Sequence, residues 1–324
     1  MKFNRQTWAW ILVMIFVMAT AVAMAFVKPE EKDEGYTISA IVNNSGSNRW
    51  TSFREGLEAA AKDYNIRIKF VATGEFTSKK SELEVVSREL EAGADGVILQ
   101  MCAGGASGDM EQILPREKCV LVETDVVPEE YYQTVGPDNQ ELGTALAERI
   151  KEDFGEELKG KTIGIMCGNV SQLALRQRMK GAETVLTEAG ATILWRMAKM
   201  SGISEQEALE EYWSMGADIV VALENDETER MVDFLETNSN TKQQIALYGI
   251  GNSEKLVYYL DKDVISALVV PNEFHMGYQS VEELSVKLKY HTGEKRSVKT
   301  EYLLIDKDHL YDEENQKILF PIVQ

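Results

Sequence analysis

Apolar runs typical of buried strands alternate along the chain with segments whose apolar residues recur every three or four positions. The first run is YTISAIVNN, at 36–44, and the segment that follows it places Trp50, Phe53 and Leu57 on one helical face. The same alternation continues through most of the chain. Continuous apolar strands separated by amphipathic helices predict parallel sheets that are covered on both faces, which defines the α/β class.

The alternating pattern occurs twice. KTIGIMCGN, at 161–169, resembles the first apolar run, and GADIVVALEND, at 216–226, echoes GADGVILQ, at 93–100. The offset between the two copies is nearly the same at both landmarks. In each copy the GAD phrase ends a helix with glycine and leads into an apolar strand. The sequence therefore predicts two copies of one βαβ layout.

A long apolar stretch lies near the beginning of the chain. It occupies 8–27, after the short segment 1–7 and before a charged linker at 28–35. An uncharged run of this length can cross a bilayer as a helix, with Lys2 and Arg5 holding segment 1–7 in the cytoplasm. A signal peptide has the same ingredients. We expect a transmembrane anchor, favoured by the length of the run, or a signal segment, and in both cases a main body outside the cytoplasmic membrane.

Composition restricts the class of partner. The 324 residues include 34 Lys and Arg against 53 Asp and Glu, which gives a formal net charge of -19. Such a chain repels phosphate backbones, so we expect no nucleic acid partner. Cys102, Cys119 and Cys167 each lie in or beside an apolar run, which favours buried thiols over a disulfide framework or a metal site.

Signatures of enzymes do not occur in the sequence. The three histidines are scattered, and neither a His-Glu-x-x-His zinc helix nor a Gly-x-Ser-x-Gly elbow occurs. We therefore expect a protein that is not an enzyme, with no catalytic residues, no bound metal and no cofactor.

Five passages, in order and at plausible spacing, resemble the type I periplasmic solute-binding proteins, particularly the ribose- and galactose-binding group. They are TISAIVNNSGSNRWTSFREGLEAAAKDYNI, AGADGVILQ, VGPDNQELGTALAERI, GADIVVALENDE and HMGYQSVEELSVKL. The resemblance implies two Rossmann-like lobes, each a parallel sheet flanked by helices, joined by three crossings and closing on a ligand at the hinge. It places lobe 1 at 36–137 plus 272–304 and lobe 2 at 138–271 plus 305–324.

Ligands of doubly wound sheets bind beyond the carboxyl ends of the strands, where this sequence is polar. These strand ends, together with the resemblance carried over position by position, select ten candidate ligand-binding residues. They are Asn48, Arg49, Trp50, Gln100, Asp125, Arg176, Asn225, Asp226, Asn252 and Asn272. The sequence departs from the sugar binders in several places. Arg49 stands where an aromatic residue is often found, the arginine expected after the fourth strand is lacking, and Gly251 and Pro271 replace an expected aspartate and glutamine.

Several of these residues have a second interpretation. Trp50 either stacks on a sugar ring or belongs to the core of its helix. Arg176 either donates a fork of hydrogen bonds into the cleft or pairs with a nearby acid. Asn225 and Asp226 are also suited to cap the helix that follows them. Because the acids Glu123 and Glu224 are expected in the same region, the sign of the charge in the cleft stays open.

The predicted function is capture of a small polar ligand, sugar or sugar-like, between two lobes outside the cytoplasm. Closure on the ligand shifts an equilibrium that a membrane partner reads. The expected partner is a membrane permease of a transporter. The alternative is a ligand-sensing subunit for a membrane receptor such as a histidine kinase.

Overall fold

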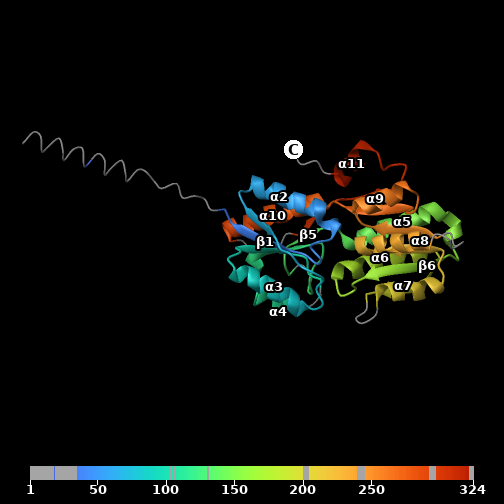
Figure 1. Cartoon of the computed structure of the whole chain (residues 1–324), viewed down its shortest axis with the longest axis horizontal. Helices are drawn as coiled ribbons and strands as arrows, with labels where there is room; N and C mark the ends of the chain where they lie inside the picture. Colours follow the sequence, from blue (N-terminus) through green and yellow to red (C-terminus); the bar gives the residue numbers. More distant parts are fainter. Residues whose placement is uncertain are drawn as a thin grey trace, which may run out of the picture. The chain divides into compact units, whose positions relative to one another are not determined.

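Two six-stranded sheets organise the chain (Figure 1). The computed structural model describes Met18 and residues 35–102, 104, 107–129, 131–199, 204–238, 245–291 and 297–320. Apart from Met18, the expected anchor or signal segment at 8–27 lies outside the described residues. Within the described part of the chain, no helix combines the length and the apolar character that a membrane span requires.

The first sheet is entirely parallel. In spatial order its strands are β11 (Val298–Lys299), β5 (Thr134–Gly136), β4 (Cys119–Val122), β3 (Gly96–Leu99), β1 (Thr37–Ile41) and β2 (Arg67–Phe70). In register, Ala40 pairs with Ile98, and Ile98 pairs with Val120. Every residue of β3 and β4 is buried, as the continuous apolar runs predicted.

The second sheet repeats this order. Its strands are β12 (Tyr302–Ile305), β10 (Ala267–Pro271), β9 (Ala246–Ile250), β8 (Ile219–Ala222), β6 (Thr162–Gly168) and β7 (Thr192–Ala198). Only β12 runs antiparallel to its neighbour. The two lobes of α/β class are thus confirmed, each with the same arrangement of strands.

The repeated GAD phrase performs the same task in both lobes. Asp95 Oδ2 accepts a hydrogen bond from the backbone N–H of Thr37 at 2.8 Å, and Asp218 Oδ2 accepts one from Thr162 at 2.7 Å. The glycine of each phrase has a positive φ, 99° and 77°, which glycine adopts without strain. Each phrase therefore ends a helix and ties the start of one strand to the next.

Helices cover both faces of each sheet, so each lobe has two apolar cores. The first sheet lies between α2 (Thr51–Asp63) with α10 (Glu273–Tyr290) and α3 (Lys79–Glu91) with α4 (Ser107–Glu111). The second sheet lies between α5 (Asn139–Phe154) with α6 (Leu173–Glu188) and α7 (Glu205–Ser214), α8 (Asn225–Thr237) and α9 (Glu254–Asp261). The last helix, α11 (Glu313–Leu319), adds Leu319 to the core beneath α9.

The chain crosses between the lobes three times. The first crossing lies between β5 and α5, and the second at Asn272, between β10 and α10. The third crossing comes earlier than the expected boundary at 304. Tyr302 already pairs with Pro271 in the second sheet, so the chain crosses at Thr300 and Glu301. Because β12 pairs antiparallel with β10, residues 302–304 belong to lobe 2 instead of lobe 1. The sequence pattern did not predict this pairing.

The three cysteines are separate buried thiols, as predicted. Cys102, Cys119 and Cys167 are at most 1% exposed, and none forms a disulfide. Burial raises the pKa of both Cys119 and Cys167 to about 12. They are therefore neutral and pack as small apolar side chains.

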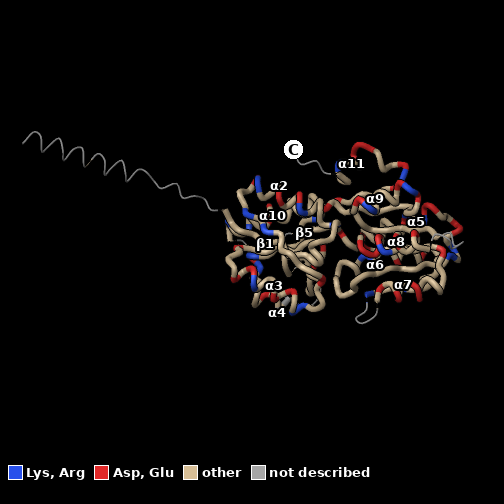
Figure 2. Tube along the Cα trace, viewed as in Figure 1, with Lys and Arg blue, Asp and Glu red and all other residues tan. Residues whose placement is uncertain are grey.

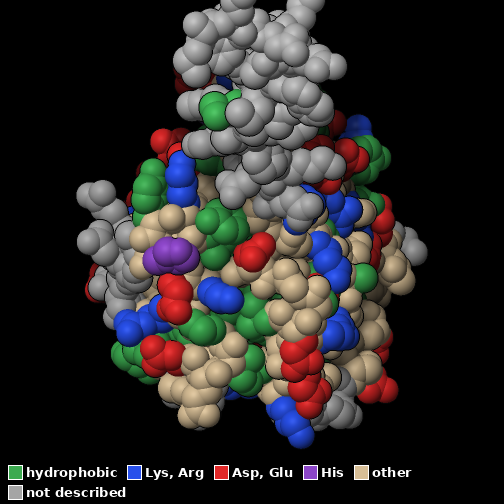
Figure 3. Space-filling model, turned by 90° about the vertical axis from the view of Figure 1, so that its left-hand side faces the viewer, with side chains coloured by type: hydrophobic (Ala, Val, Ile, Leu, Met, Phe, Trp, Pro, Cys, Tyr) green, Lys and Arg blue, Asp and Glu red, His purple; other side chains and the backbone are tan. Residues whose placement is uncertain are grey.

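Charged residues lie mainly along the helices and loops that surround the sheets (Figure 2). On the described part of the face shown in Figure 3, basic, acidic and apolar side chains are interspersed. This mixing agrees with a surface that is solvated rather than specialised for a polyanion.

One helix pair in each lobe crosses at glycine. A Cβ atom at Gly56 of α2 would lie 2.0 Å from a backbone oxygen of α10, and one at Gly277 of α10 would lie 2.2 Å from a backbone oxygen of α2. Gly143 of α5 and Gly181 of α6 make the equivalent contacts in the second lobe, at 1.9 and 2.1 Å. Since no side chain fits there, the helix backbones lie close together and their positions are fixed.

We expect the substitution Gly277→Ala to lower the free energy of unfolding by about 1–3 kcal/mol, because the new methyl group forces α10 away from α2. Urea denaturation of the purified chain measures the change. Gly74→Ala is the matched control, since a Cβ there meets no atom within 4 Å. Equal urea midpoints for the two variants would contradict this account of the helix crossing.

Candidate functional site

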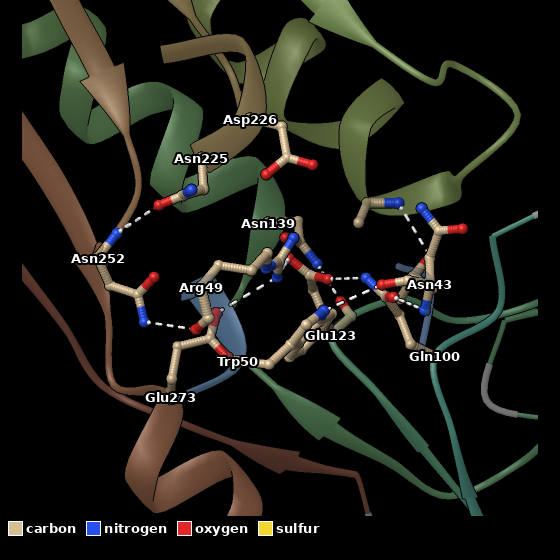
Figure 4. A network of polar contacts seen from close by, with 12 residues as sticks. Asn43, Arg49, Trp50, Gln100, Glu123, Asn139, Asn225, Asp226, Asn252 and Glu273 are labelled. Atoms are coloured by element: carbon tan, nitrogen blue, oxygen red, sulfur yellow. Dashed lines mark hydrogen bonds and ion pairs between the residues drawn. The ribbon is translucent and has the colours of Figure 1, made fainter. Parts of the chain in front are cut away.

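Polar residues at the carboxyl ends of strands from both lobes meet in one buried network (Figure 4). Gln100 follows β3 and Glu123 follows β4 in the first lobe. Glu224 and Asn225 follow β8 in the second lobe. This is the place where doubly wound sheets bind their ligands.

The carboxylate of Glu123 is the centre of the network. Its Oε1 atom accepts hydrogen bonds from Arg49 Nη2 at 2.8 Å and from Arg178 Nη2 at 2.9 Å. Its Oε2 atom accepts from Gln100 Nε2, and its backbone oxygen accepts from Asn139 Nδ2 at 2.6 Å. Because Arg49 belongs to the first lobe and Arg178 to the second, one carboxylate holds a guanidinium from each lobe.

Arg49 reaches the network from the short 3-10 helix η1 (Asn48–Trp50), which begins where Ser47 Oγ accepts from the backbone N–H of Arg49. Its guanidinium also donates to Glu273 Oε1 at 3.3 Å. The carbon of the guanidinium lies 4.0 Å from the centre of the Trp50 ring, within the range of a cation–π contact. Only 8% of Arg49 is exposed.

Arg178 is the buried arginine of the second lobe. Its Nε atom donates to Asn139 Oδ1 at 2.9 Å, and its Nη1 atom donates to the backbone oxygen of Leu223 at 3.0 Å. The residue lies on the face of α6 that is otherwise apolar or small. Its backbone is held against Gly143 by the helix crossing described above. Packing therefore directs this guanidinium toward the contact between the two lobes, which we call the seam.

The ion pairs decide the charge of the buried acids. Burial alone would raise the pKa of Glu123, but the charges of Arg49 and Arg178 outweigh it and lower the pKa to about 2. Burial alone would lower the pKa of Arg49, yet the carboxylates of Glu123 and Glu273 raise it. Burial raises the pKa of Glu273 to about 7, although Arg49 opposes the shift. Glu123 is therefore the permanent anion.

Glu224 lies on the second-lobe side of the same region. Burial raises its pKa to about 8, and the charges of Glu227 and Asp226 add to the shift. Its carboxyl group uses space that only a glycine leaves open: a Cβ at Gly168 would lie 1.8 Å from Glu224 Oε1, and Gly168 has a φ of 63°. This acid is therefore neutral over much of the physiological pH range.

A cavity of about 10 Å³ remains beside the network, enough for about one water molecule. Its lining residues are Arg49, Glu123, Arg178, Asn225, Ile250, Gly251, Asn252, Pro271 and Glu273. Two atoms of these lining residues, Arg49 Nε and Glu273 Oε2, are buried without a hydrogen-bond partner among the described residues. The residues that line the cavity thus include one unpaired donor and one unpaired carboxyl oxygen.

A larger cavity of about 610 Å³ lies outside this network. It is lined by Asn48, Thr51, Ser52, Glu55, Glu229, Asn252, Ser253, Glu254, Lys255, Leu319 and Phe320. Asn252 lines both cavities. The larger cavity therefore lies between α2, α9 and the end of α11.

Five of the predicted ligand residues contact the network or line its cavity. They are Arg49, Trp50, Gln100, Asn225 and Asn252. Trp50 is 1% exposed and packs in the core beneath α2, while its Nε1 atom donates to the backbone oxygen of Asn43 at 3.0 Å. In this closed arrangement its ring therefore lies under the Arg49 guanidinium and offers no open face for stacking.

Asn225 and Asn252 order the second-lobe side of the seam. Asn225 Oδ1 accepts from the backbone N–H of Asn252 at 3.2 Å and of Ser253 at 3.1 Å. Asn252 Nδ2 donates to the backbone oxygen of Arg49 at 3.2 Å, which joins the two lobes. Asn225 thus fixes the loop before α9 instead of capping its own helix.

Three predicted residues lie at the edge of the site. Asn48 is exposed and lines the larger cavity. Asp226 Oδ1 accepts a long hydrogen bond of 3.5 Å from Ser47 Oγ in the other lobe. Asn272 Oδ1 accepts from the backbone N–H of His275 at 3.0 Å and so caps α10 at the second crossing.

The remaining two predicted residues have contacts within their own loops. Arg176 Nη1 donates to the backbone oxygens of Val170 and Ser171, both at 2.8 Å, so its fork holds the loop before α6. Arg178 is the residue that enters the network, because positions two apart on an α-helix differ by about 200° in direction. Asp125 Oδ1 accepts from the next backbone N–H at 2.7 Å.

Sequence reasoning missed Arg178, Glu273 and Asn139. A signal existed for the two charged residues, since each lies on the buried stripe of its helix, three or four positions from small or apolar residues. A buried charge requires a partner, so a charge on such a stripe indicates an ion pair. Asn139 carries no signal of this kind, because an Asn in the first turn of a helix is ordinary.

Comparison with known proteins agrees with this architecture. The family model described as periplasmic binding protein domain matches residues 38–294. This chain belongs to the periplasmic binding protein family. No curated protein sequence matches it.

Several solved structures share the fold. A carbohydrate transporter solute-binding protein from Agrobacterium radiobacter, in complex with D-arabinose, has a TM-score of 0.75 at 16% identity, over 88% of this chain and 99% of that one. A solute-binding protein from Bacillus halodurans with bound myo-inositol has a TM-score of 0.71 at 15% identity, over 88% and 99%. The XylFII-LytSN complex has a TM-score of 0.70 at 16% identity, over 85% and 98%.

The raised pKa of Glu224 predicts how stability depends on pH. Between its ordinary value near 4.5 and about 8, the folded chain keeps a proton that the unfolded chain loses. The contribution of this group to stability therefore falls as pH rises through that window. Between pH 5 and pH 8.5 we expect the free energy of unfolding of wild type to fall by roughly 2 kcal/mol more than that of Glu224→Gln, a figure that allows for the partial exposure of the side chain.

Urea denaturation at the two pH values measures this difference. Glu58→Gln, at an exposed position of α2, is the control and should keep the wild-type pH dependence. If Glu224→Gln shows the same pH dependence as wild type, Glu224 is not a buried neutral acid in the folded protein.

Proposed function

We propose that this protein is an extracytoplasmic solute-binding protein, in which two lobes close on a small polar solute and present it to a membrane partner. The observation that carries the proposal is the contact between the lobes. Buried polar side chains from both lobes converge there, where the strands end, and a donor and a carboxyl oxygen of residues that line the cavity have no partner among the described residues. An unpartnered buried polar group is costly, so such atoms favour a polar guest.

The free atoms favour a hydroxyl group. A hydroxyl can accept from Arg49 Nε and donate to Glu273 Oε2, and it can reverse the second role if that carboxyl is protonated. Hydroxyl-rich molecules, sugars or sugar-like polyols, offer many such groups. The arabinose and myo-inositol bound by structurally similar proteins support this choice.

Closure provides the signal. Several hydrogen bonds cross the seam in addition to those of Glu123: Asn169 Nδ2 donates to the backbone oxygen of Cys102 at 3.1 Å, and the backbone N–H of Ala174 donates to Thr124 Oγ1 at 3.2 Å. These contacts exist only while the lobes lie together. A solute that binds between the lobes therefore biases an open and closed equilibrium that a partner can read.

The partner in this proposal is the permease of a membrane transporter, with segment 8–27 holding the protein at the membrane. A receptor such as a membrane histidine kinase is the second candidate. The observation that favours it is the similarity to the fold in the XylFII-LytSN complex. Crosslinking of the full chain in native membranes distinguishes the two candidates by the class of protein captured.

We expect at least one pentose, hexose or polyol to stabilise the full-length chain in a thermal-shift screen. A solute at 100 times its dissociation constant adds about 2.7 kcal/mol, which raises the melting temperature by several degrees. Glu273→Leu should abolish the shift because it removes the free carboxyl oxygen, whereas Glu58→Gln should preserve it. A shift given only by apolar compounds, or unchanged in Glu273→Leu, would contradict the proposal.

A further inference from the structure

The guanidinium of Arg49 fills the space between the lobes that the fold reserves for a solute. Arg49 is only 8% exposed, and the cavity left beside its guanidinium has a volume of about 10 Å³. Ligand sites of small molecules usually enclose about 300–1,000 Å³. In the closed arrangement, therefore, the cleft has an occupant that is part of the chain.

The surroundings of this guanidinium form a built cation site. Two buried carboxylates approach it, Glu123 at 2.8 Å and Glu273 at 3.3 Å, with exposed side-chain fractions of 5% and 4%. The indole of Trp50 covers one face at 4.0 Å. Asp226, from the second lobe, adds a further favourable charge. Carboxylates and an aromatic face together are the usual components of a site for guanidinium or ammonium groups.

The charges explain why a cation is required there. Glu123 and Glu273 form ion pairs with Arg49, and Glu123 also pairs with Arg178. Asp226 adds a favourable charge to Arg49, whereas Glu224 is neutral as described above. If Arg49 left and a neutral molecule replaced it, Glu273 would lose its one ion pair among the described residues, and Glu123 would keep only Arg178. A guest that carries a positive charge avoids that loss.

We propose that Arg49 is a resident occupant of a cation subsite formed by Glu123, Glu273 and Trp50, so that the lobes close without an external solute. A solute that carries a guanidinium or ammonium group enters this subsite by displacing the guanidinium, whereas the hydroxyl contact with Arg49 Nε described above belongs to a neutral solute. The subsite takes small guanidinium or ammonium groups, including those of amino sugars. The inference rests on the proposed function, because it concerns the same cleft, and it specifies the charge of the solute that competes best.

Another arginine of the same region offers a matched control. Arg54, in α2, lies 4.4 Å from the centre of the Phe70 ring and donates to the backbone oxygen of Ser45. It is exposed, and no ion pair to a carboxylate is found for it among the described residues. It shares the aromatic contact of Arg49 but not the buried acids.

The first experiment measures binding of guanidinium to the full-length variant Arg49→Ala by titration calorimetry, at low millimolar concentration and constant ionic strength. Guanidinium should bind this variant at least about tenfold more tightly than it binds wild type or Arg54→Ala. Urea, the neutral molecule of the same shape, should not bind detectably. Equal affinity for urea and guanidinium, or no gain in Arg49→Ala, would overturn the proposal.

The second experiment does not depend on the folding of that variant. Spin labels at Glu58→Cys and Glu188→Cys, exposed positions on helices of opposite lobes, report the distance between the lobes in otherwise unaltered, solute-free protein. The proposal requires that the short distance is already populated in solute-free protein, because Arg49 stabilises the closed form, and that a stabilising solute increases this population. A solute-free protein that shows the long distance alone would overturn it, while the solute screen above would still stand.

Discussion

The shared carboxylate of Glu123 is the interaction on which the closed structure depends. It lies at the end of β4 and accepts from Arg49 of its own lobe and from Arg178 of the other. Removing one partner of a buried ion pair costs about 3–5 kcal/mol, because an uncompensated charge is left inside the protein. Each of the three residues therefore constrains the other two, and separation of the lobes at this point breaks the contact between Glu123 and Arg178.

The duplicated fold explains why such a seam exists. Both lobes direct the carboxyl ends of their strands toward the same place, so loops that are polar in each copy face one another. The glycine crossings of α5 with α6 and of α2 with α10 fix the helices from which Arg178 and Glu273 project. A pair of lobes that captures a solute and a pair that closes on its own arginine need the same arrangement of strands and helices. They differ in whether a solute or the Arg49 side chain lies between the lobes.

Much of the fold could be predicted from the sequence, because it depends on local patterns. Strand and helix periodicity, the repeated GAD phrase and the buried cysteines each reflect a few neighbouring residues. The seam depends instead on residues far apart in the sequence, such as Arg49 and Glu123. The choice of Arg178 over Arg176 depends on the rotation of α6, and the position of the third crossing depends on the pairing of β12, so neither could be predicted from residue types alone.

The coupling between Glu123 and Arg178 measures whether the two lobes meet at this carboxylate. A double-mutant cycle with Glu123→Gln and Arg178→Met, measured as free energies of unfolding of the full chain without solute, isolates the energy of this contact between lobes. The account predicts a favourable coupling of at least about 1.5 kcal/mol. A coupling within about 0.3 kcal/mol of zero would mean that the two side chains do not meet in solution, and would contradict it.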